Sequence, residues 1–489
     1  MSYRDLALAL PVVVPAILAV AGYFMGWSRP TRILSLATPI ALALAALAAR
    51  VGSPLSLFGA AIYADSMTAF MLITISLVSL LAIVASWSYL EAEAAHGPES
   101  AHKARRYLVL LQIFLAAMAG AILSDNLGLI WVAIEATTIS TAFLVAHKGS
   151  SKALEAAWKY VIICSFGITL AFFGTVLLYF SATHAGLPSA RALDIHELIA
   201  VSTKMHNAAT KLALGLLLLG YGAKVGLVPF HTWLADAHSQ APAPVSALMS
   251  GVLLSVSFGI LLRIKNFSDL SVGSGLFRNG LLVMGMATII VAALLLVGQK
   301  DFKRLFAYSS LENMGLIAVA ASIGSHLALY ALLLQIFAHG IAKSTAFISA
   351  GQLQERTGST AISEVTDLAR RSPGLALALA LATIALLGFP PFALFSTETA
   401  IGYALGSSGG IITLLVAALA LLVGFASIVR HVSTMLFSQP VVAATKFQIS
   451  RLESLPLWAG ITISLYVGIF ASPLFGVIER ASSVLGAVR

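Results

Sequence analysis

The chain has 489 residues, of which 59% are hydrophobic and only 10% are charged, whereas a soluble protein of this size carries roughly a quarter charged residues. Most of it must therefore face lipid or other apolar segments. The net charge of +9 comes mainly from Lys and Arg in short loops, which favours a membrane protein over a nucleic-acid-binding one.

Cofactor chemistry has little support in the sequence. The single cysteine, Cys164, excludes a disulfide framework and a thiolate-held iron–sulfur cluster within this chain. No glycine-rich phosphate loop follows a strand-like segment. We therefore expect no cofactor in this chain, and any electron transfer would belong to another subunit.

Apolar segments recur along the whole sequence. A helix needs about 20 apolar residues to cross the hydrocarbon core of a bilayer. On that basis 1–489 is predicted to be one all-α polytopic membrane domain with about fourteen spans. The first is expected to be a membrane helix, because no small-residue signal-peptide cleavage site follows it. The predicted spans lie near 5–25, 31–49, 62–89, 106–124, 126–146, 157–181, 208–228, 243–263, 275–297, 304–322, 325–350, 371–394, 409–437 and 454–474.

The loops between these spans are short and unequal in charge. Segment 91–106 is predicted to be a solvated loop, and 190–200 fits a surface helix or a plain loop equally well. Seventeen of the 29 Lys and Arg residues lie in loops that follow odd-numbered spans, and ten lie on the opposite side. Loops rich in Lys and Arg stay in the cytoplasm. The chain is therefore predicted to lie in a prokaryotic inner membrane with both termini outside the cytoplasm. The positive loops are 26–32, 103–106, 148–159, 300–304, 356–371 and 430–451.

Proline interrupts the seventh span at 222–230 and the twelfth at 387–395. Proline removes a backbone donor and clashes with the preceding turn, so each helix is predicted to break there. A break inside the membrane is tolerated only against protein or water. Paired interruptions of this kind indicate an inverted repeat. The two repeats are expected over 106–263 and 275–437, with 62–105 as the third span and its loop and 454–474 as the last span.

Charged residues occur where the spans should be apolar: Glu135, Lys224 and Lys343 lie within predicted spans, and Glu398 follows the break in the twelfth. Each costs about 2.5–3.5 kcal/mol to insert at the centre of a helix, so such residues persist mainly when paired or when they line a water path. They belong to four different predicted helices, as a lateral relay requires. His339 lies four residues before Lys343, on the same helix face.

Reversible protonation is the chemistry that suits these residues. Burial favours the uncharged forms of lysine and glutamate, and a nearby opposite charge favours the charged forms. His339 needs little help to exchange a proton near neutral pH. Glu312 and the hydroxyls of Ser246, Ser250 and Ser255 are further candidates for a relay. Proton or cation translocation is therefore expected, with structural ion pairing as the alternative.

Segment 229–244 contains His231, Asp236 and His238. A seven-residue histidine spacing with one carboxylate is a weak metal pattern, and no metal is expected. The alternatives are a role in proton access or capping of the broken helix. Segment 301–304 is expected to orient and dock the chain.

The most specific segments resemble one family. The chain resembles the antiporter-like proton-translocating subunits shared by respiratory complex I, membrane-bound group 4 NiFe hydrogenases and Mrp cation/proton antiporters. Segment 153–160 looks most like hydrogenase-4 component F. The segments that carry the resemblance are 126–135, 228–238, 242–247, 300–310 and 351–357.

The resemblance implies a fourteen-helix fold with two inverted five-helix repeats and broken helices seven and twelve. It also implies a glutamate–lysine pair at Glu135 and Lys224, a central position at Lys343 with His339, and an exit residue at Glu398. The chain departs from many relatives in two places. Ser255 stands where they have lysine or histidine, and Asn313 stands where they often have histidine.

These features lead to one main functional hypothesis and two alternatives. The main hypothesis is a proton-translocating subunit that works with other membrane subunits of a complex I-like or hydrogenase-4-like complex. The first alternative is an Mrp-like Na⁺/H⁺ antiporter subunit. The second is a membrane partner that energises a soluble CO₂-hydrating or redox enzyme.

Overall fold

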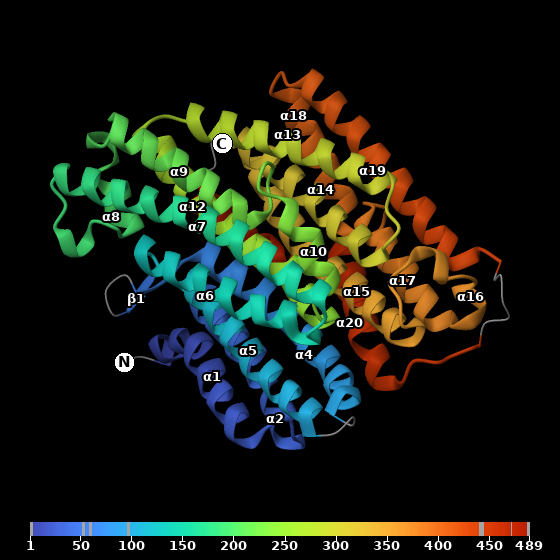
Figure 1. Ribbon diagram of the computed structural model, residues 1–489. Coiled ribbons are helices and arrows are strands. Elements are labelled where there is room, and N and C mark those ends of the chain that lie inside the picture. Colours follow the sequence, from blue (N-terminus) through green and yellow to red (C-terminus); the bar gives the residue numbers. More distant parts are fainter. Residues whose placement is uncertain are drawn as a thin grey trace.

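The computed structural model describes residues 3–50, 54–57, 61–94, 98–439, 445–470 and 472–486. These residues form a bundle of long, tilted helices with one small antiparallel hairpin (Figure 1). The hairpin consists of β1 (Leu55–Leu57) and β2 (Ile62–Ala64), with Ser56 paired to Tyr63.

The helices of the first half, in chain order, are α1 (Tyr3–Met25), α2 (Arg29–Leu34), α3 (Ala37–Arg50), α4 (Ser66–Ala94), α5 (Pro98–Leu123), α6 (Leu127–Val145), α7 (Ser151–His184), α8 (Ile195–Ala200), α9 (Ala208–Val225), α10 (Thr232–Gln240), α11 (Ala243–Leu248) and α12 (Leu254–Ser271). Those of the second half are α13 (Gly275–Val297), α14 (Phe302–Ile323), α15 (His326–Thr357), α16 (Leu368–Arg371), α17 (Pro373–Leu386), α18 (Ala393–Ser407), α19 (Ile411–Phe437), α20 (Arg451–Ile469) and α21 (Ser472–Val484). A π-helical turn, η4 (Met249–Leu253), joins α11 to α12, and the short 3₁₀ turns are η1 (Ala146–Lys148), η2 (Ser189–Arg191), η3 (Ser202–Lys204) and η5 (Ile362–Glu364).

The predicted all-α polytopic fold is confirmed. In the part of the chain that the structure describes, 13 helices are long and apolar enough to cross a membrane. The predicted twelfth span is divided between α17 and α18, and neither half reaches 18 residues. The broken span therefore accounts for the difference from fourteen.

Several predicted ends were wrong. Most of segment 91–106 is helical, because α4 continues to Ala94 and α5 begins at Pro98. Charged residues at these ends lie beyond the apolar stretch and pair along the helix, as Lys103 does with Glu99 at 3.1 Å. Residues 62–64 form β2 instead of the start of a span. Residues 95–97, residues 440–444 of the positive loop 430–451, and residue 471 of the predicted last span lie outside the described residues.

Segment 190–200 contains a short surface helix, α8. Its apolar face is covered, because Ile195 and Leu198 are buried. The plain-loop alternative for this segment is thereby excluded.

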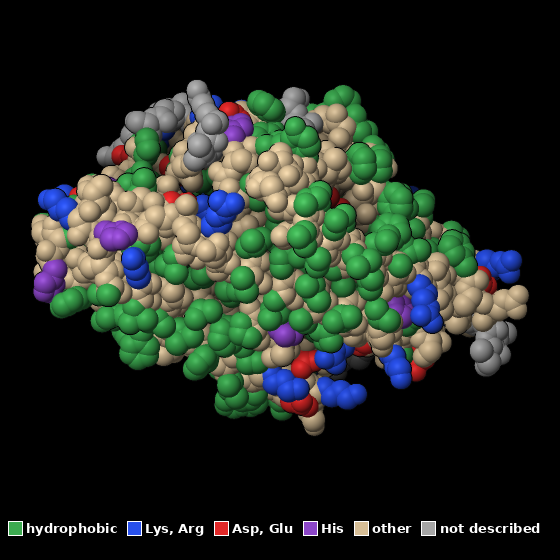
Figure 2. All heavy atoms as spheres, turned by 90° about the horizontal axis from the view of Figure 1, so that it is seen from above, with side chains coloured by type: hydrophobic (Ala, Val, Ile, Leu, Met, Phe, Trp, Pro, Cys, Tyr) green, Lys and Arg blue, Asp and Glu red, His purple; other side chains and the backbone are tan. Residues whose placement is uncertain are grey.

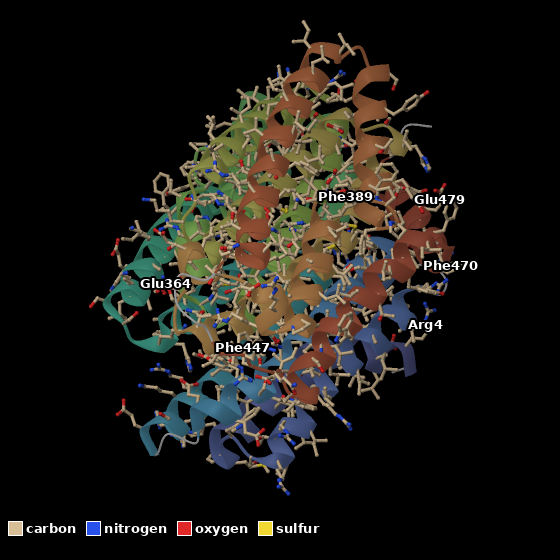
Figure 3. The ribbon with its side chains drawn as sticks, turned by 90° about the vertical axis from the view of Figure 1, so that its right-hand side faces the viewer. Arg4, Glu364, Phe389, Phe447, Phe470 and Glu479 are labelled. Atoms are coloured by element: carbon tan, nitrogen blue, oxygen red, sulfur yellow. The ribbon has the colours of Figure 1, made fainter. Side chains whose placement is uncertain are left out.

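Both chain ends lie on the same side of the bundle. In Figure 1 the N-terminus, β1 and α8 lie opposite α2 and α16. Near the C-terminus, Asn266 Nδ2 at the end of α12 donates to the carbonyl of Val484 at 3.2 Å. Figure 3 places Arg4 and Glu479 on one side and Glu364 on the other, with Phe389 between them. An even number of crossings follows.

Hydrophobic side chains cover the middle of the face in Figure 2, and Lys and Arg gather toward its edges. A belt of this kind faces lipid. The chain is therefore a multi-pass membrane protein.

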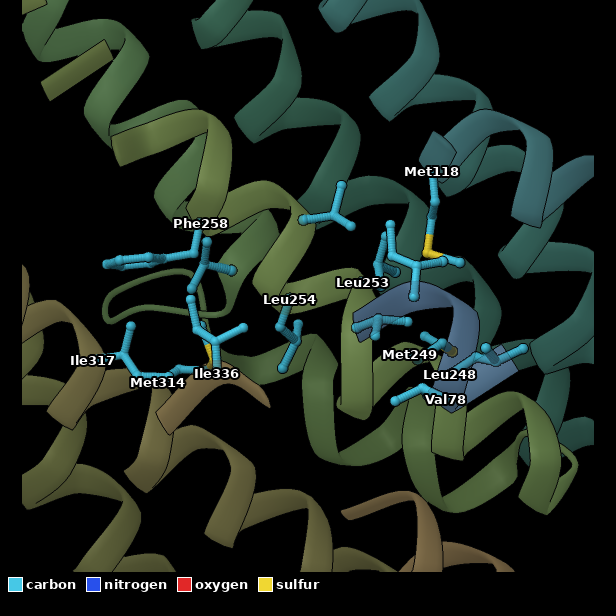
Figure 4. Packing of buried hydrophobic residues seen from close by; sticks show 14 of the residues in the cluster. Val78, Met118, Leu248, Met249, Leu253, Leu254, Phe258, Met314, Ile317 and Ile336 are labelled. Carbon is cyan, nitrogen blue, oxygen red and sulfur yellow. The ribbon is translucent and has the colours of Figure 1, made fainter. Parts of the chain in front are cut away.

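The centre of the bundle is the crossing of the α11–η4–α12 segment with α15. The apolar stretches of both are buried on every side, which suits helices that are hydrophobic all round. Backbones approach closely where glycines meet: a Cβ on Gly251 would lie 2.9 Å from the carbonyl of Gly340, and a Cβ on Gly340 would lie 2.7 Å from the carbonyl of Gly251. Figure 4 shows the surrounding packing of Val78, Met118, Leu248, Met249, Leu253, Leu254, Phe258, Met314, Ile317 and Ile336.

Both predicted helix breaks are confirmed. Helix α9 ends at Val225 and is capped by Gly226 (φ +87°), and Gly388 (φ +63°) lies just after α17. Positive φ is a conformation that glycine adopts without steric cost. Three residues later each break has a proline, Pro229 and Pro391, followed by phenylalanine. This shared Gly-X-X-Pro-Phe pattern relates the two breaks to each other. Five spans separate the starts of the two repeats, so they cross in opposite directions.

Candidate ion-relay site

Lys224 lies in the last turn of α9, just before the break, and is completely buried. Its ammonium donates to Thr138 Oγ1 at 2.9 Å and to the Tyr160 hydroxyl at 2.6 Å. It also lies 4.8 Å from the centre of the Tyr160 ring. Hydroxyls from α6 and α7 and an aromatic face thus solvate a charge that the bilayer would otherwise reject.

Glu135 lies on α6, one helical turn before Thr138. Its Oε1 accepts a hydrogen bond from Ser165 at 2.9 Å, and its Oε2 is buried without a hydrogen-bond partner. Lys224 makes no ion pair within 4.0 Å in the described structure. The expected glutamate–lysine pair is therefore not in direct contact; Lys224 binds Thr138, which lies one turn of α6 beyond Glu135. This geometry weighs against a purely structural ion pair.

The sequence analysis missed Thr138, Tyr160 and Ser165. Tyr160 lies in the segment 153–160 that carries part of the resemblance, and its hydroxyl also bonds Thr141 Oγ1 at 2.7 Å. Hydroxyl side chains occur in most turns of these helices, so the presence of one in the sequence does not identify a site residue.

His238 lies on a line of packed rings that runs from Tyr160, beside Lys224, toward α15. Its Nδ1 bonds the carbonyl of Leu234 at 2.7 Å, and its buried Nε2 has no partner. A line of rings runs from Tyr160 to Trp233 (4.8 Å), from Trp233 to His238 (6.1 Å) and from His238 to Phe347 (5.7 Å). Phe347 follows Lys343 by one turn of α15, so this line of rings connects the surroundings of Lys224 with those of Lys343 and includes the titratable His238.

His231 and Asp236 do not join His238. His231 is half-buried at the start of α10. Asp236 pairs with Lys159 at 3.1 Å and with Arg304 at 2.5 Å. Within the described ranges no group of three His, Cys, Asp or Glu residues could hold a metal ion. Asp236 thus ties α10 to α7 and α14.

Lys343 and His339 lie completely buried in the middle of α15. The ammonium of Lys343 donates to the carbonyl of Phe306 at 2.6 Å and to the hydroxyl of Ser309. Both ring nitrogens of His339 are buried without a partner. The hydroxyl of Ser255, on α12, is buried and unpartnered as well. Buried polar groups of this kind are normally satisfied by water, which suits a hydrated route.

An amide network leads from α14 toward α18. Gln335 Nε2 donates to Asn313 Oδ1 at 2.8 Å, and the Thr397 hydroxyl donates to Gln335 Oε1. Glu398 follows Thr397 directly. Glu398 and Glu312 line the same cavity between α14, α17, α18 and α19. The structure thus brings the twelfth-span carboxylate together with Glu312 instead of with Lys343.

The interpretation of segment 301–304 as a docking element was wrong for Lys303. Lys303 is completely buried, and its ammonium donates to the carbonyl of Ala241 at 2.7 Å. That carbonyl lies at the end of α10, where the helix dipole attracts a cation. Asp301 caps α14 through the backbone amide of Arg304 at 2.9 Å. This segment fastens α14 to the second half of the broken seventh span.

The family model described as NADH:quinone oxidoreductase/Mrp antiporter, TM, matches residues 124–424, which is more than half of the chain. The chain belongs to this family. The matched region contains every predicted relay residue from Glu135 to Glu398.

Sequence relatives support the family assignment. The hydrogenase-4 component F homolog of Methylacidiphilum infernorum (isolate V4) is 35% identical over 71% of this chain and 74% of its own length. For seven further curated relatives the matched segment covers 52% to 64% of their length.

Solved structures of the family share the fold along nearly the whole chain. A chain of the membrane-bound sulfane sulfur reductase, an archaeal respiratory membrane complex, superposes with a TM-score of 0.87 at 22% identity, covering 99% of this chain and 98% of its own. A chain of the Mrp complex from Dietzia sp. DQ12-45-1b gives 0.86 at 21% identity with the same coverage. Both are chains of multi-subunit membrane complexes. The prediction of an antiporter-like membrane subunit is confirmed.

Proposed function

We propose that this subunit moves protons across a prokaryotic inner membrane, along a relay that runs from Glu135 through Lys224, His238 and Lys343 to Glu398. The observation that supports it is the enclosure of Lys224 by neutral hydroxyls beside Glu135, with no carboxylate in direct contact. An ammonium held in this way loses its proton more readily than one locked in an ion pair.

Titratable groups and hydroxyls lie along most of the proposed relay, and the Trp233 ring lies between Tyr160 and His238. The hydroxyl of Thr138, one turn of α6 beyond Glu135, accepts from Lys224, and the rings of Tyr160, Trp233 and His238 lead on toward α15. His339 lies one turn from Lys343. The unpartnered Ser255 hydroxyl lies in the central segment, where water would bridge the position that holds lysine or histidine in many relatives.

The energy for transport is proposed to come from partner subunits. This chain is not expected to carry a cofactor, so the driving reaction would belong to other membrane and soluble subunits of a respiratory or hydrogenase-like complex. The hydrogenase-4 component F homolog and the respiratory complexes that share the fold support such an assembly. We place both termini outside the cytoplasm, as the charge of the loops favours.

An Mrp-like Na⁺/H⁺ antiporter subunit is the second candidate. It is supported by the superposition on a chain of the Mrp complex over 99% of this chain. Cation-dependent proton exchange by the purified protein without an electron donor would favour it. Capture of a zinc enzyme as the bound partner would instead favour the CO₂-hydrating alternative.

The Glu135→Gln variant tests the proposal. It keeps the hydrogen bond to Ser165 but removes the charge that draws protons to Lys224, so coupled proton uptake into inverted vesicles should fall at least about tenfold. Glu155→Gln, on an exposed turn of α7, is the matched control and should behave as wild type. Equal transport by both variants would overturn the proposed relay.

The Tyr160→Phe variant tests the hydroxyl beside Lys224. The ring stays and the bundle keeps its packing, but the ammonium retains only Thr138 as a hydrogen-bond partner. A hydrogen bond to a charged group contributes about 1.5–3 kcal/mol, so proton transport should slow about tenfold or more. Tyr179→Phe, at an exposed position of the same helix, should leave the rate unchanged.

A further inference from the structure

A cavity of about 340 Å³ lies between α14, α17, α18 and α19. It is large enough for several water molecules. Phe425 lines it and packs against Phe389, at the break of the twelfth span, with ring centres 5.5 Å apart. Figure 3 shows Phe389 part-way between the two sides of the molecule. The cavity therefore lies at membrane depth.

Two carboxylates line this cavity, Glu312 from α14 and Glu398 from α18. Glu312 is only 6% exposed, and its Oε1 is buried without a hydrogen-bond partner. A carboxylate oxygen in this position lacks the water or donor that it needs. Glu312 thus presents an oxygen ligand without a hydrogen-bond partner at the cavity.

No lysine, arginine or histidine is among the residues that line the cavity. The remaining lining is apolar apart from Asn313, whose Oδ1 already accepts from Gln335. Helix α17 also ends here with Leu386 and Leu387, and the carbonyl end of a helix carries partial negative charge. Outside this lining, Lys343 of α15 faces Glu312, but one ammonium can offset only one of the two carboxylates. Both carboxylates therefore remain ionised only with a further cation.

Two glycines make room for the carboxylates. A Cβ on Gly424 of α19 would overlap Glu312 Oε1, and a Cβ on Gly388 would overlap Glu398 Oε2. Gly388 also has a positive φ, but Gly424 lies inside a regular helix that any residue could occupy. The lack of a side chain at Gly424 therefore leaves the space that the Glu312 carboxylate occupies.

We propose that Glu312 and Glu398 form a binding site for one monovalent cation, at which Na⁺ and a proton compete. Four carboxylate oxygens and cavity water supply the oxygen ligands that a hard cation prefers, and the end of α17 adds favourable dipoles. The inference rests on the proposed function, because it places the exchange of ions at the last carboxylate of the relay.

The experiment measures proton release on binding, without any transport. The full-length protein, with the membrane subunits that accompany it, is placed in lipid nanodiscs in weak buffer with a pH-indicating dye. NaCl should release up to about one proton per chain from the carboxylate pair. Choline chloride at equal ionic strength should release none. Absence of a sodium-specific release from wild type would overturn the proposal.

Variants assign the release to this cavity. Glu312→Gln and Glu398→Gln should each abolish it. Gly424→Ala displaces only the end of the Glu312 side chain and should weaken the apparent Na⁺ affinity about ten- to hundredfold. Gly402→Ala is the matched control on α18, because its nearest neighbour would be Leu414 Cδ1 at an ordinary 3.5 Å, and it should bind as wild type. Release that survives in Glu312→Gln would overturn the assignment.

The outcomes separate this proposal from the relay itself. Thermal unfolding of each variant identifies those that fail to fold, and binding of radioactive ²²Na⁺ by the folded variants gives a second readout. If wild type shows no sodium-specific proton release but transport still depends on Glu135, the cation site alone is contradicted. If sodium-specific proton release requires Glu312 but Glu135→Gln leaves transport unchanged, the relay alone is contradicted.

Discussion

Replacing Lys224 with alanine is expected to abolish coupled proton translocation while the protein still assembles. The ammonium bridges α6 and α7 from the end of α9, and its removal interrupts the proposed route between Glu135 and His238. Proton uptake by inverted vesicles that contain the complex should fall below about one hundredth of the wild-type rate, the scale of losing a positioned proton donor.

The fold should tolerate Lys224→Ala because no carboxylate lies within ion-pairing distance of the ammonium. Thr138 and Tyr160 are neutral, and the Tyr160 hydroxyl keeps its bond to Thr141. Lys211→Ala, at the exposed start of the same helix, is the matched control and should transport protons normally. Wild-type pumping by Lys224→Ala, with assembly checked by co-purification, would contradict the relay.

The second large effect is expected at Arg263. Its guanidinium binds the carboxylate of Asp65 at two points, each 2.8 Å, and one of its nitrogens lies 2.9 Å from Thr68 Oγ1. Both partners are nearly buried, with the Asp65 side chain 3% exposed. Arg263→Met leaves that carboxylate buried and uncompensated, so the free energy of unfolding should drop by about 3–5 kcal/mol.

A thermal or denaturant unfolding series in detergent measures this loss. Arg278→Met, which removes an exposed arginine from the next helix, should have little effect. The double variant Asp65→Leu/Arg263→Met should recover most of the stability, because no unpaired charge remains. A double variant as unstable as Arg263→Met alone would show that the pair is not the cause.

The contribution of this pair should depend on pH. Burial alone would raise the pKa of the Asp65 carboxyl, but Arg263 and the hydrogen bonds from Arg263 and Thr68 hold it below its ordinary value. The stabilisation is therefore fully present above the unfolded-state pKa of about 3.9 and is lost as pH falls through the folded-state pKa. The stability difference between wild type and Arg263→Met should shrink below about pH 4.

Much of the architecture could be predicted from the sequence because bilayer insertion is a local requirement. Each span needs its own apolar stretch, so the spans were located without knowledge of their neighbours. The breaks at Pro229 and Pro391 follow from the chemistry of proline. Lys224 and Lys343 were predicted as site residues because a charge among apolar neighbours is costly wherever the helix packs.

The contacts within the site could not be predicted in the same way, because they join distant segments. Lys303 has the sequence surroundings of a loop charge, between Asp301 and Arg304, and is buried only because α10 ends beside it, 62 residues away. Glu312 and Glu398 share a cavity because four helices pack together around it. The sequence of any one span does not indicate this packing. The hydroxyls of Thr138 and Tyr160 are likewise selected by packing.

The meeting of Gly251 with Gly340 limits how the two repeats can move. The first glycine belongs to the eighth span and the second to the eleventh, and their backbones leave no room for even a methyl group. One repeat cannot slide past the other without a collision at this point, so large rocking motions of the kind used by many carriers are obstructed. Ion transfer between the halves is therefore expected to proceed by rotation of side chains such as Lys343 and by rearrangement of water, within a scaffold that stays fixed.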